Sequence, residues 1–123
     1  MGLGESEDPS LRDLRLARFG ETVAAAFLAR RGARILGRNV RVGRGELDLV
    51  VRFGDRTVAV EVKTVGGSAV ADGAIARIDG TKLRQVRRLA NHLAPRAGPV
   101  RVDFVGVRTT ADGVTVDWRK GVA

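Results

Sequence analysis

The sequence predicts a single α/β domain whose helices and strands follow the order αβββαββ around a mixed sheet. A helical apolar stripe opens the chain, two alternating apolar runs meet at a tight turn within residues 44–63, and a second helical stripe at residues 79–93 precedes two further strands. A chain of 123 residues is long enough for one domain with a modest core. We expect this domain to span residues 10–120, behind a disordered acidic tail at residues 1–9.

The first helix is expected from about Leu11 to Arg31. Asp8 or Ser10 can cap its start, and Gly32 provides a usual C-terminal stop. Apolar side chains that recur every three or four residues predict one buried stripe, formed by Leu16, Phe19, Val23, Ala26 and Phe27. Gly20 costs the helix about 1 kcal/mol relative to alanine, so we expect another backbone or a nucleic acid to pass close to Glu21, the residue that follows it.

The remaining elements follow from apolar alternation and turn signals. The second helix is expected to end before Pro95. Residues 65–78 form a loop rich in Gly and Ala, which is either a substrate-ordered flap beside a site or a plain connection. Three further strands are expected, at residues 33–42, 99–108 and 113–118.

The hairpin at residues 44–63 carries the most information. Its Gly54-Asp55 pair suits a two-residue type II′ turn, because glycine comes first in the loop. A register with Phe53 opposite Arg56 gives the hairpin one apolar side and one charged side. The apolar pairs are then Leu47–Val62, Leu49–Val60 and Val51–Val58, and the charged pairs are Asp48–Glu61 and Glu46–Lys63.

The predicted opposition of Asp48 and Glu61 is unfavourable when nothing lies between them. Side chains directly across an antiparallel pair have Cβ atoms about 5 Å apart, and two like charges at that distance repel by roughly 3 kcal/mol at an effective dielectric of about 20. A divalent cation such as Mg²⁺ would reverse the sign, since hard cations take carboxylate oxygens. The alternative is a solvated charged face, in which Lys63 and Arg52 neutralise the carboxylates.

Lys63 favours the metal-site interpretation. The chain has 19 arginines and 3 lysines, so a lysine two residues after Glu61 is not the default cation. Lysine is a compact charge whose pKa can shift, whereas a guanidinium stays protonated and spreads its charge. Glu61 and Lys63 share one strand face, because the side-chain period of a strand is two. One carboxylate from each strand and this ammonium can together hold a metal, a phosphate and an attacking water.

The pattern Asp48, then Glu61-Val62-Lys63, resembles the PD-(D/E)xK signature of the restriction-endonuclease-like superfamily. An ordered set of further motifs is similar to the YraN family, small bacterial proteins presumed to be nuclease-like. These motifs lie at residues 16–41, 45–50, 60–64, 82–84 and 101–105. Val65 departs from the family pattern, which commonly has an arginine there, and its presence removes one expected phosphate contact.

The resemblance implies a restriction-endonuclease-like fold and a metal-dependent nuclease site. The implied catalytic residues are Glu21, Asp48, Glu61 and Lys63. The implied ligands of Mg²⁺ or Mn²⁺ are Asp48, Glu61, the Val62 carbonyl and Glu21. Lys63 would orient or deprotonate the attacking water and steady the charge that develops on phosphorus.

Other charged residues have two interpretations each. Glu21 either contacts the metal, directly or through water, or pairs with Arg18 or Arg41. Glu46 either tunes Lys63 or serves as its salt-bridge partner, and we favour the latter. The second helix carries a basic face that either contacts nucleic-acid phosphates or is merely solvated. Its candidate contact residues are Lys82, Arg84, Gln85 and Arg88.

Three residues that resemble functional ones are interpreted as structural. Asp103 lies on a late strand and is expected to have a structural role. Trp118 is expected to pack in the core, since one tryptophan cannot form a stacking platform. His92 is an ordinary helix-end residue, because the chain has no cysteine and no second histidine to complete a zinc site.

The composition fits a cytoplasmic protein that binds nucleic acid. The absence of cysteine excludes disulfides and thiolate metal sites. No apolar run approaches the roughly 20 residues that span a membrane, and the first ten residues lack the features of a signal peptide. The net charge of +8 favours a polyanionic partner, DNA foremost. The alternative explanation of this charge is the arginine bias of a GC-rich genome.

The sequence leaves more than one function open. The first is a divalent-metal-dependent DNA endonuclease, structure-selective for branched DNA and possible as a homodimer, as in small members of the superfamily. The second is a non-catalytic nucleic-acid-binding protein that retains the fold, which predicts salt-sensitive binding without cleavage. A protein-interaction adaptor is a weaker third hypothesis, since neither the charge nor the choice of lysine would matter to it.

Overall fold

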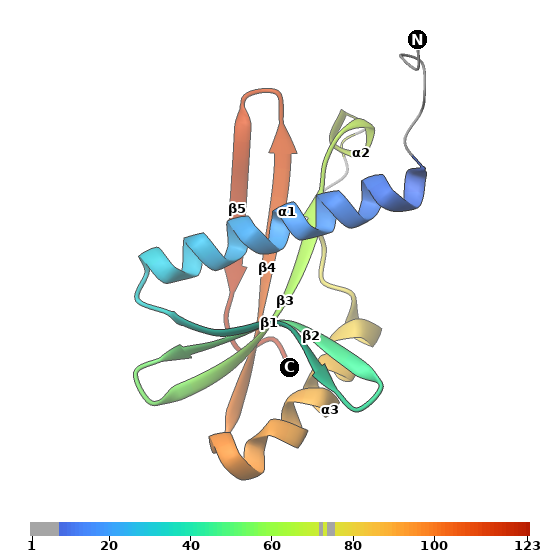
Figure 1. Ribbon diagram of the computed structural model, residues 1–123. Coiled ribbons are helices and arrows are strands. Elements are labelled where there is room, and N and C mark those ends of the chain that lie inside the picture. Colours follow the sequence, from blue (N-terminus) through green and yellow to red (C-terminus); the bar gives the residue numbers. More distant parts are fainter. Residues whose placement is uncertain (1–7, 72, 74–75) are drawn as a thin grey trace.

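The computed structural model describes residues 8–71, 73 and 76–123, so most of the predicted tail at residues 1–9 lies outside the described residues. The predicted α/β class, mixed sheet and αβββαββ order are confirmed, and one short helix is added inside the predicted loop (Figure 1). The elements are α1 (Pro9–Arg30), β1 (Arg34–Val42), β2 (Gly45–Phe53), β3 (Arg56–Val65), α2 (Ser68–Ala71), α3 (Gly80–Ala97), β4 (Val100–Thr110) and β5 (Gly113–Arg119).

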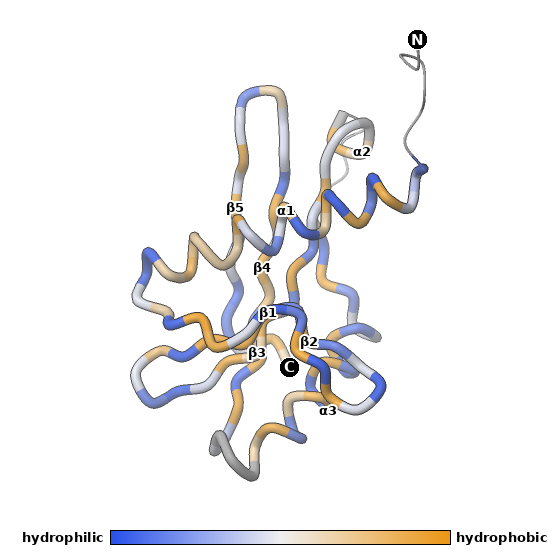
Figure 2. Tube along the Cα trace, viewed as in Figure 1, coloured by the Kyte–Doolittle hydropathy of each residue, from blue (hydrophilic) through white to orange (hydrophobic). Residues whose placement is uncertain are grey.

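The sheet has five strands in the order β1-β2-β3-β4-β5 and is covered by a helix on each face. β3 and β4 run parallel and are connected through α3, whereas the other neighbouring strands are antiparallel. Val58 and Val60 pack in one core cluster with Leu28 of α1, and Ala59 between them packs in a second cluster with Val86 of α3. Because successive side chains of a strand point to opposite faces, α1 and α3 lie on opposite sides of the sheet. Hydrophilic residues gather at the hairpin turns (Figure 2).

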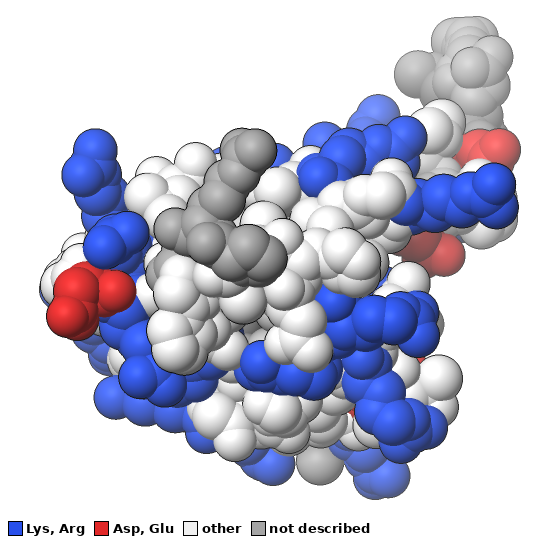
Figure 3. All heavy atoms as spheres, turned by 90° about the horizontal axis from the view of Figure 1, so that it is seen from below, with Lys and Arg blue, Asp and Glu red and all other residues white. Residues whose placement is uncertain are grey.

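The surface is strongly basic at the end of the molecule that carries α3. Figure 3 looks at this end from below and shows far more Lys and Arg than Asp and Glu. The imbalance is consistent with the net charge of +8. None of the helices within the described ranges is long and apolar enough to cross a lipid bilayer.

The β2–β3 hairpin forms as predicted near its turn. Phe53 pairs with Arg56, and the ladder continues to the pair of Leu49 with Val60. Gly54 has a φ of 61°, whereas Asp55 has no positive φ. A type I′ turn needs positive φ at both central residues, so this turn agrees with the predicted type II′.

Beyond Leu49 the predicted register is wrong, because β2 leaves β3. In the described part of the chain the ladder holds no pair past Leu49 and Val60, while β2 stays paired with β1 to its first residue. Leu47 packs in the cluster beneath α3, whereas Leu49 packs in the cluster beneath α1. Residues two apart in a regular strand share a face, so β2 twists at Asp48. The cross-strand pairs that this twist removes are Leu47–Val62, Asp48–Glu61 and Glu46–Lys63.

The buried face of α1 also differs from the predicted stripe. Phe19 and Ala26 are exposed, and the buried positions are Gly20, Glu21, Ala24, Ala25 and Leu28. Both sets have a helical period, so periodicity alone cannot choose between them. Close packing determines which face of α1 is buried, because a Cβ on Gly20 would lie 1.8 Å from Thr64 Oγ1 and only glycine fits there. The close neighbour expected at this part of α1 is therefore β3, and the large side chains of α1 flank this contact.

The second long helix, α3, starts as predicted and ends later. Asp79 caps it by accepting two backbone N–H groups of the first turn. The helix passes through Pro95 to Ala97, because proline removes a single N–H and the Gly98 N–H still reaches the Ala94 carbonyl at 2.9 Å. Gly98, with a φ of 73°, then ends the helix.

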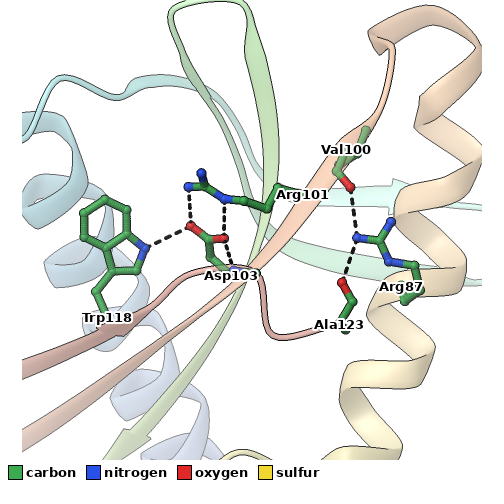
Figure 4. Close-up of polar contacts among 7 residues, drawn as sticks. Arg87, Val100, Arg101, Asp103, Trp118 and Ala123 are labelled. Atoms are coloured by element: carbon green, nitrogen blue, oxygen red, sulfur yellow. Dashed lines mark hydrogen bonds and ion pairs between the residues drawn. The ribbon is translucent and has the colours of Figure 1, made fainter.

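Asp103 is a fully buried carboxylate that accepts four hydrogen bonds, two from Arg101 on its own strand and two that tie the end of β5 to β4 (Figure 4). Arg101 donates from Nε and Nη2 at 2.7 and 2.8 Å. Trp118 Nε1 and the Gly121 N–H each donate at 3.0 Å. The Trp118 ring stacks on Phe53 with centroids 5.6 Å apart, so the tryptophan packs as predicted. This satisfied network agrees with the structural interpretation of Asp103.

Replacing Asp103 with Asn should destabilise the fold by about 3 kcal/mol or more, since breaking a buried pair leaves Arg101 without its counter-charge. Urea unfolding of Asp103→Asn measures this loss. The control is Asp117→Asn, because Asp117 is 56% exposed and pairs with Arg119 at 3.1 Å. That variant should change the free energy of unfolding by no more than about 0.5 kcal/mol. Equal losses in both variants would contradict the role assigned to Asp103.

Candidate active site

A cavity of about 630 Å³ lies where β2 leaves β3, between α1 and the start of α3. Its lining combines both signs of charge from separate elements of the chain. The predicted site residues Glu21, Asp48, Glu61, Val62, Lys63 and Lys82 all line it. The fold therefore gathers in one place the residues that the sequence singled out at distant positions.

Asp48 and Glu61 meet through their side chains instead of through the predicted ladder pair. Asp48 Oδ2 accepts the backbone N–H of Val62 at 2.8 Å. The Asp48 and Glu61 carboxyls also hydrogen-bond to each other. The two acidic groups are thus adjacent, as the hairpin pattern predicted, but the strand twist at Asp48 brings them together.

The pKa of Glu61 is raised to about 8, and burial is the main cause. The hydrogen bond and charge of Asp48 also raise this pKa, whereas the charges of Lys82 and Lys63 lower it. At neutral pH the Glu61 carboxyl therefore holds a proton when no cation is bound. A protonated carboxyl can donate to its ionised neighbour, which makes the close approach to Asp48 tolerable.

Glu21 enters the same cavity from α1 and is 7% exposed. Burial is the main cause that raises its pKa, and the charge of Asp48 adds to the rise. A hydrogen bond from Asn39 and the charge of Arg18 lower it. Within the described ranges no ion pair joins Glu21 to Arg18 or Arg41. Of the alternative interpretation, in which Glu21 pairs with an arginine, the structure retains only the nearby charge of Arg18.

Two of the three lysines of the chain line the cavity. Lys63 is exposed and Lys82 is half-buried, and both lower the pKa of Glu61. Glu46, interpreted from the sequence as the partner of Lys63, is exposed on the part of β2 that has left β3. Among the described residues no ion pair connects them, because the ladder ends before reaching either one.

The residues present fit a hard divalent cation that keeps part of its water shell. Three buried oxygens have no hydrogen-bond partner in the described ranges, namely Glu21 Oε1, Glu61 Oε1 and Thr64 Oγ1. In the part of the chain that is described, no three acidic or histidine side chains converge into a complete cage. Mg²⁺ commonly takes one or two carboxylates and retains several waters, so Asp48 and Glu61 suit it.

Three residues of this region were not predicted as part of the site. Asn39 has a φ of 51° and hydrogen-bonds Glu21. The feature of the sequence that could have indicated this position is the residue type, because asparagine tolerates left-handed backbone better than most residues. Thr64 contributes the unpartnered hydroxyl that also contacts α1. Arg77 lines the cavity and supplies it with a guanidinium. Val65 stands where the family commonly has an arginine, so here the guanidinium comes from a different position of the chain. Nothing periodic marks Arg77 in its loop, of which residues 72, 74 and 75 lie outside the described ones.

The four predicted nucleic-acid contacts separate in space. Lys82 lines the cavity, while Gln85 and Arg88 line a second hollow farther along α3. Arg84 is exposed, lines neither hollow, and donates from Nη2 to Thr81 Oγ1 at 3.1 Å. The basic face of α3 therefore has an inner part at the cavity and an outer part beyond it.

Residues 20–107 match the family described as uncharacterised protein family UPF0102. The chain belongs to this family. A UPF0102 protein of Parafrankia sp. is 44% identical over 112 residues, covering 87% of this chain and 94% of that protein. A UPF0102 protein of Streptomyces coelicolor is 39% identical over 130 residues, covering 100% and 98%. The YraN resemblance of the motifs is confirmed by this membership.

Among solved structures, SfsA of Pyrococcus furiosus in complex with Ca²⁺ is similar, with a TM-score of 0.37 and 18% sequence identity. The match covers 87% of this chain and 63% of SfsA, so the chain spans less than two thirds of the length of that protein.

Replacing Gly20 with alanine should destabilise the protein by up to about 2 kcal/mol, because overpacking costs about 1–3 kcal/mol and helix propensity returns about 1 kcal/mol. Urea unfolding of Gly20→Ala, Thr64→Ala and the double variant measures the coupling between them. The double variant should recover part of the loss, since Thr64 Oγ1 is the atom nearest the new methyl. Ala26→Gly, at an exposed position of the same helix, measures propensity alone. A Gly20→Ala protein more stable than wild type would contradict the close approach of α1 to β3.

The Glu61 carboxyl should make the metal-free protein lose stability as pH rises. Its pKa is raised from 4.5 to about 8 in the folded state, so the stabilisation is complete below about pH 4.5 and is lost as pH rises through about 8. The loss is on the order of a few kcal/mol. Unfolding in chelator across this range, with Glu61→Gln as the non-titrating reference, isolates the effect. Parallel stability curves for the two proteins would show that Glu61 titrates normally.

Proposed function

We propose that this UPF0102 protein is a divalent-metal-dependent nuclease that hydrolyses phosphodiester bonds in DNA. The observation that carries the proposal is the adjacent Asp48 and Glu61 pair, open to a cavity that also holds Lys63 and Lys82. A carboxyl pair beside two ammonium groups provides separate places for a cation and for the anionic phosphate. Neither a plain scaffold nor an adaptor requires this combination.

Asp48 and Glu61 are the groups that would hold Mg²⁺ or Mn²⁺, with the Val62 carbonyl and Glu21 as further candidates. The bound ion supplies Lewis-acid chemistry, since it lowers the pKa of water and neutralises phosphoryl oxygens. Glu61 must give up its proton for this role, and the charges of Lys82 and Lys63 favour its ionised form. Asp48 is kept in place by the Val62 N–H.

The basic side chains of the cavity act on the phosphate. Lys63 orients or deprotonates the attacking water and steadies the negative charge that develops on the phosphoryl oxygens. Lys82 and Arg77, on either side of the start of α3, bind the non-bridging oxygens of the bond to be cleaved. Thr64 contributes a hydroxyl whose oxygen has no hydrogen-bond partner among the described residues.

The substrate is selected by shape more than by sequence. Base sequence is read by contacts to base edges, whereas phosphate contacts only position a partner. The charged groups of the cavity and of α3 suit phosphates, and this supports a structure-selective activity on branched DNA. A homodimer would place two such cavities on one branched substrate.

The second candidate is a nucleic-acid-binding protein without catalysis. The observation that favours it is the basic end of the molecule, which provides salt-sensitive binding whether or not the cavity reacts (Figure 3). The two functions share the surface and differ only in whether Asp48, Glu61 and Lys63 are needed for a chemical step.

Labelled single-stranded, duplex, flapped and four-way-junction DNA, incubated with Mg²⁺ or Mn²⁺, tests the nuclease. Asp48→Asn, Glu61→Gln and Lys63→Met should each lower the cleavage rate on the order of 100-fold or more. The matched control is Glu46→Gln, because Glu46 is an exposed acid on β2 that does not line the cavity. Its rate should stay within about twofold of wild type.

Circular dichroism of each variant excludes unfolding as the cause of a lost rate. Cleavage that survives in Asp48→Asn and Glu61→Gln would overturn the proposed site. Tight, salt-sensitive binding with no cleavage of any of the four DNA shapes would replace the nuclease with the binding protein.

A further inference from the structure

A second hollow of about 270 Å³ lies between the β1–β2 turn and the middle of α3. The turn contributes Gly43, Arg44 and Gly45, and the helix contributes Gln85, Arg88, Leu89 and His92. Its floor is apolar, because Leu89 is buried and lies so close to Gly45 that a Cβ there would meet it at 2.7 Å. The departure of β2 from β3 creates this hollow as well, since it carries the turn onto α3.

The charges of this hollow differ from those of the cavity. No acidic residue lines it, and the whole of α3, from Gly80 to Ala97, contains none. Arg44 and Arg88 are exposed and approach from two different elements. No hydrogen bond or ion pair engages either guanidinium in the described part of the chain. Two unpaired guanidiniums around a shallow hollow suit an anion with several oxygens, such as a phosphate.

The spacing along α3 relates the hollow to the cavity. Lys82 lines the cavity and Arg88, six residues later, lines the hollow. At a rise of about 1.5 Å per residue, the two positions lie about 9 Å apart along the helix. In a B-form duplex each strand advances about 3.4 Å per nucleotide along the helix axis, so this separation spans about two or three nucleotides of one strand.

We propose that Arg44 and Arg88 bind a phosphate of the same DNA strand, about two or three nucleotides away from the phosphodiester held in the cavity. The inference rests on the proposed function, because it takes the cavity as the place of the reacting bond. Gln85, half-buried between the two positions, faces the intervening nucleotide or its phosphate. The β1–β2 turn and α3 together form a clamp that sets the register of the strand.

The first test is the salt dependence of binding of a short duplex DNA. Arg44→Ala and Arg88→Ala should each reduce the slope of log K against log salt by about one, the loss of one phosphate contact. The matched control is Arg56→Ala, an exposed arginine at the first residue of β3, opposite the far end of β2, whose slope should equal that of wild type. Unchanged slopes in Arg44→Ala and Arg88→Ala would overturn the proposal.

The second test replaces one phosphate at a time with a neutral methylphosphonate and measures affinity. Two sensitive positions are expected, one whose effect disappears in Lys82→Ala and one whose effect disappears in the Arg44→Ala/Arg88→Ala double variant, about two or three nucleotides apart. A free phosphate or nucleotide that fills the hollow would give no such position along a strand, and that result would overturn the proposal.

This measurement separates the inference from the proposed function, because it needs binding and no cleavage. Two coupled positions together with absent cleavage would retain the clamp and remove the nuclease. Cleavage that depends on Glu61, with no position coupled to Arg44 and Arg88, would retain the nuclease and remove the clamp.

Discussion

The hydrogen bond from the Val62 N–H to Asp48 Oδ2, at 2.8 Å, is the contact on which the shape of the site depends. When a strand separates from its neighbour, the backbone N–H groups between them lose their partners. A buried donor without a partner costs about 1–3 kcal/mol. Here the Asp48 side chain accepts the hydrogen bond of the Val62 N–H, so β2 can twist away from β3. Since β1 stays paired with β2, the two-stranded arm reaches α3 as a unit. The cavity on one side of the arm and the hollow beneath its turn share this one cause.

The fully buried Asp103 and the half-buried Glu61 show how an acidic side chain can be structural or reactive. Asp103 is closed by a bidentate arginine and two further donors, which leaves its oxygens no capacity for a ligand. Glu61 is surrounded by a second carboxyl and by lysines, and one of its oxygens has no partner. An arginine near Glu61 would form a bidentate pair with the carboxylate. Both carboxyl oxygens would then be occupied and could not bind a cation. Lysine balances the charge while leaving the carboxyl oxygens accessible to a cation.

Much of the fold could be predicted from the sequence, because it depends on local signals. The hairpin turn, the start of α3 at Asp79 and the order of elements follow from turn chemistry, capping and apolar alternation. The predicted catalytic and metal-binding residues do line one cavity. The twist at Asp48 could not be predicted, since it comes from a side chain competing with a ladder. The orientation of α1 depends on Gly20 against Thr64, a contact between residues far apart in the sequence.

The arginine bias of a GC-rich genome explains the amount of positive charge better than its distribution. Such a bias raises arginine everywhere, yet two of the three lysines stand at the carboxyl pair. It also gives no reason for acidic residues to avoid α3 from Gly80 to Ala97 while five of them line the adjacent cavity, namely Asp13, Glu21, Asp48, Glu61 and Asp79. This separation favours a strand of phosphates, because acidic residues on its path would repel it. The placement of the charges, more than their sum, therefore argues for a nucleic-acid partner.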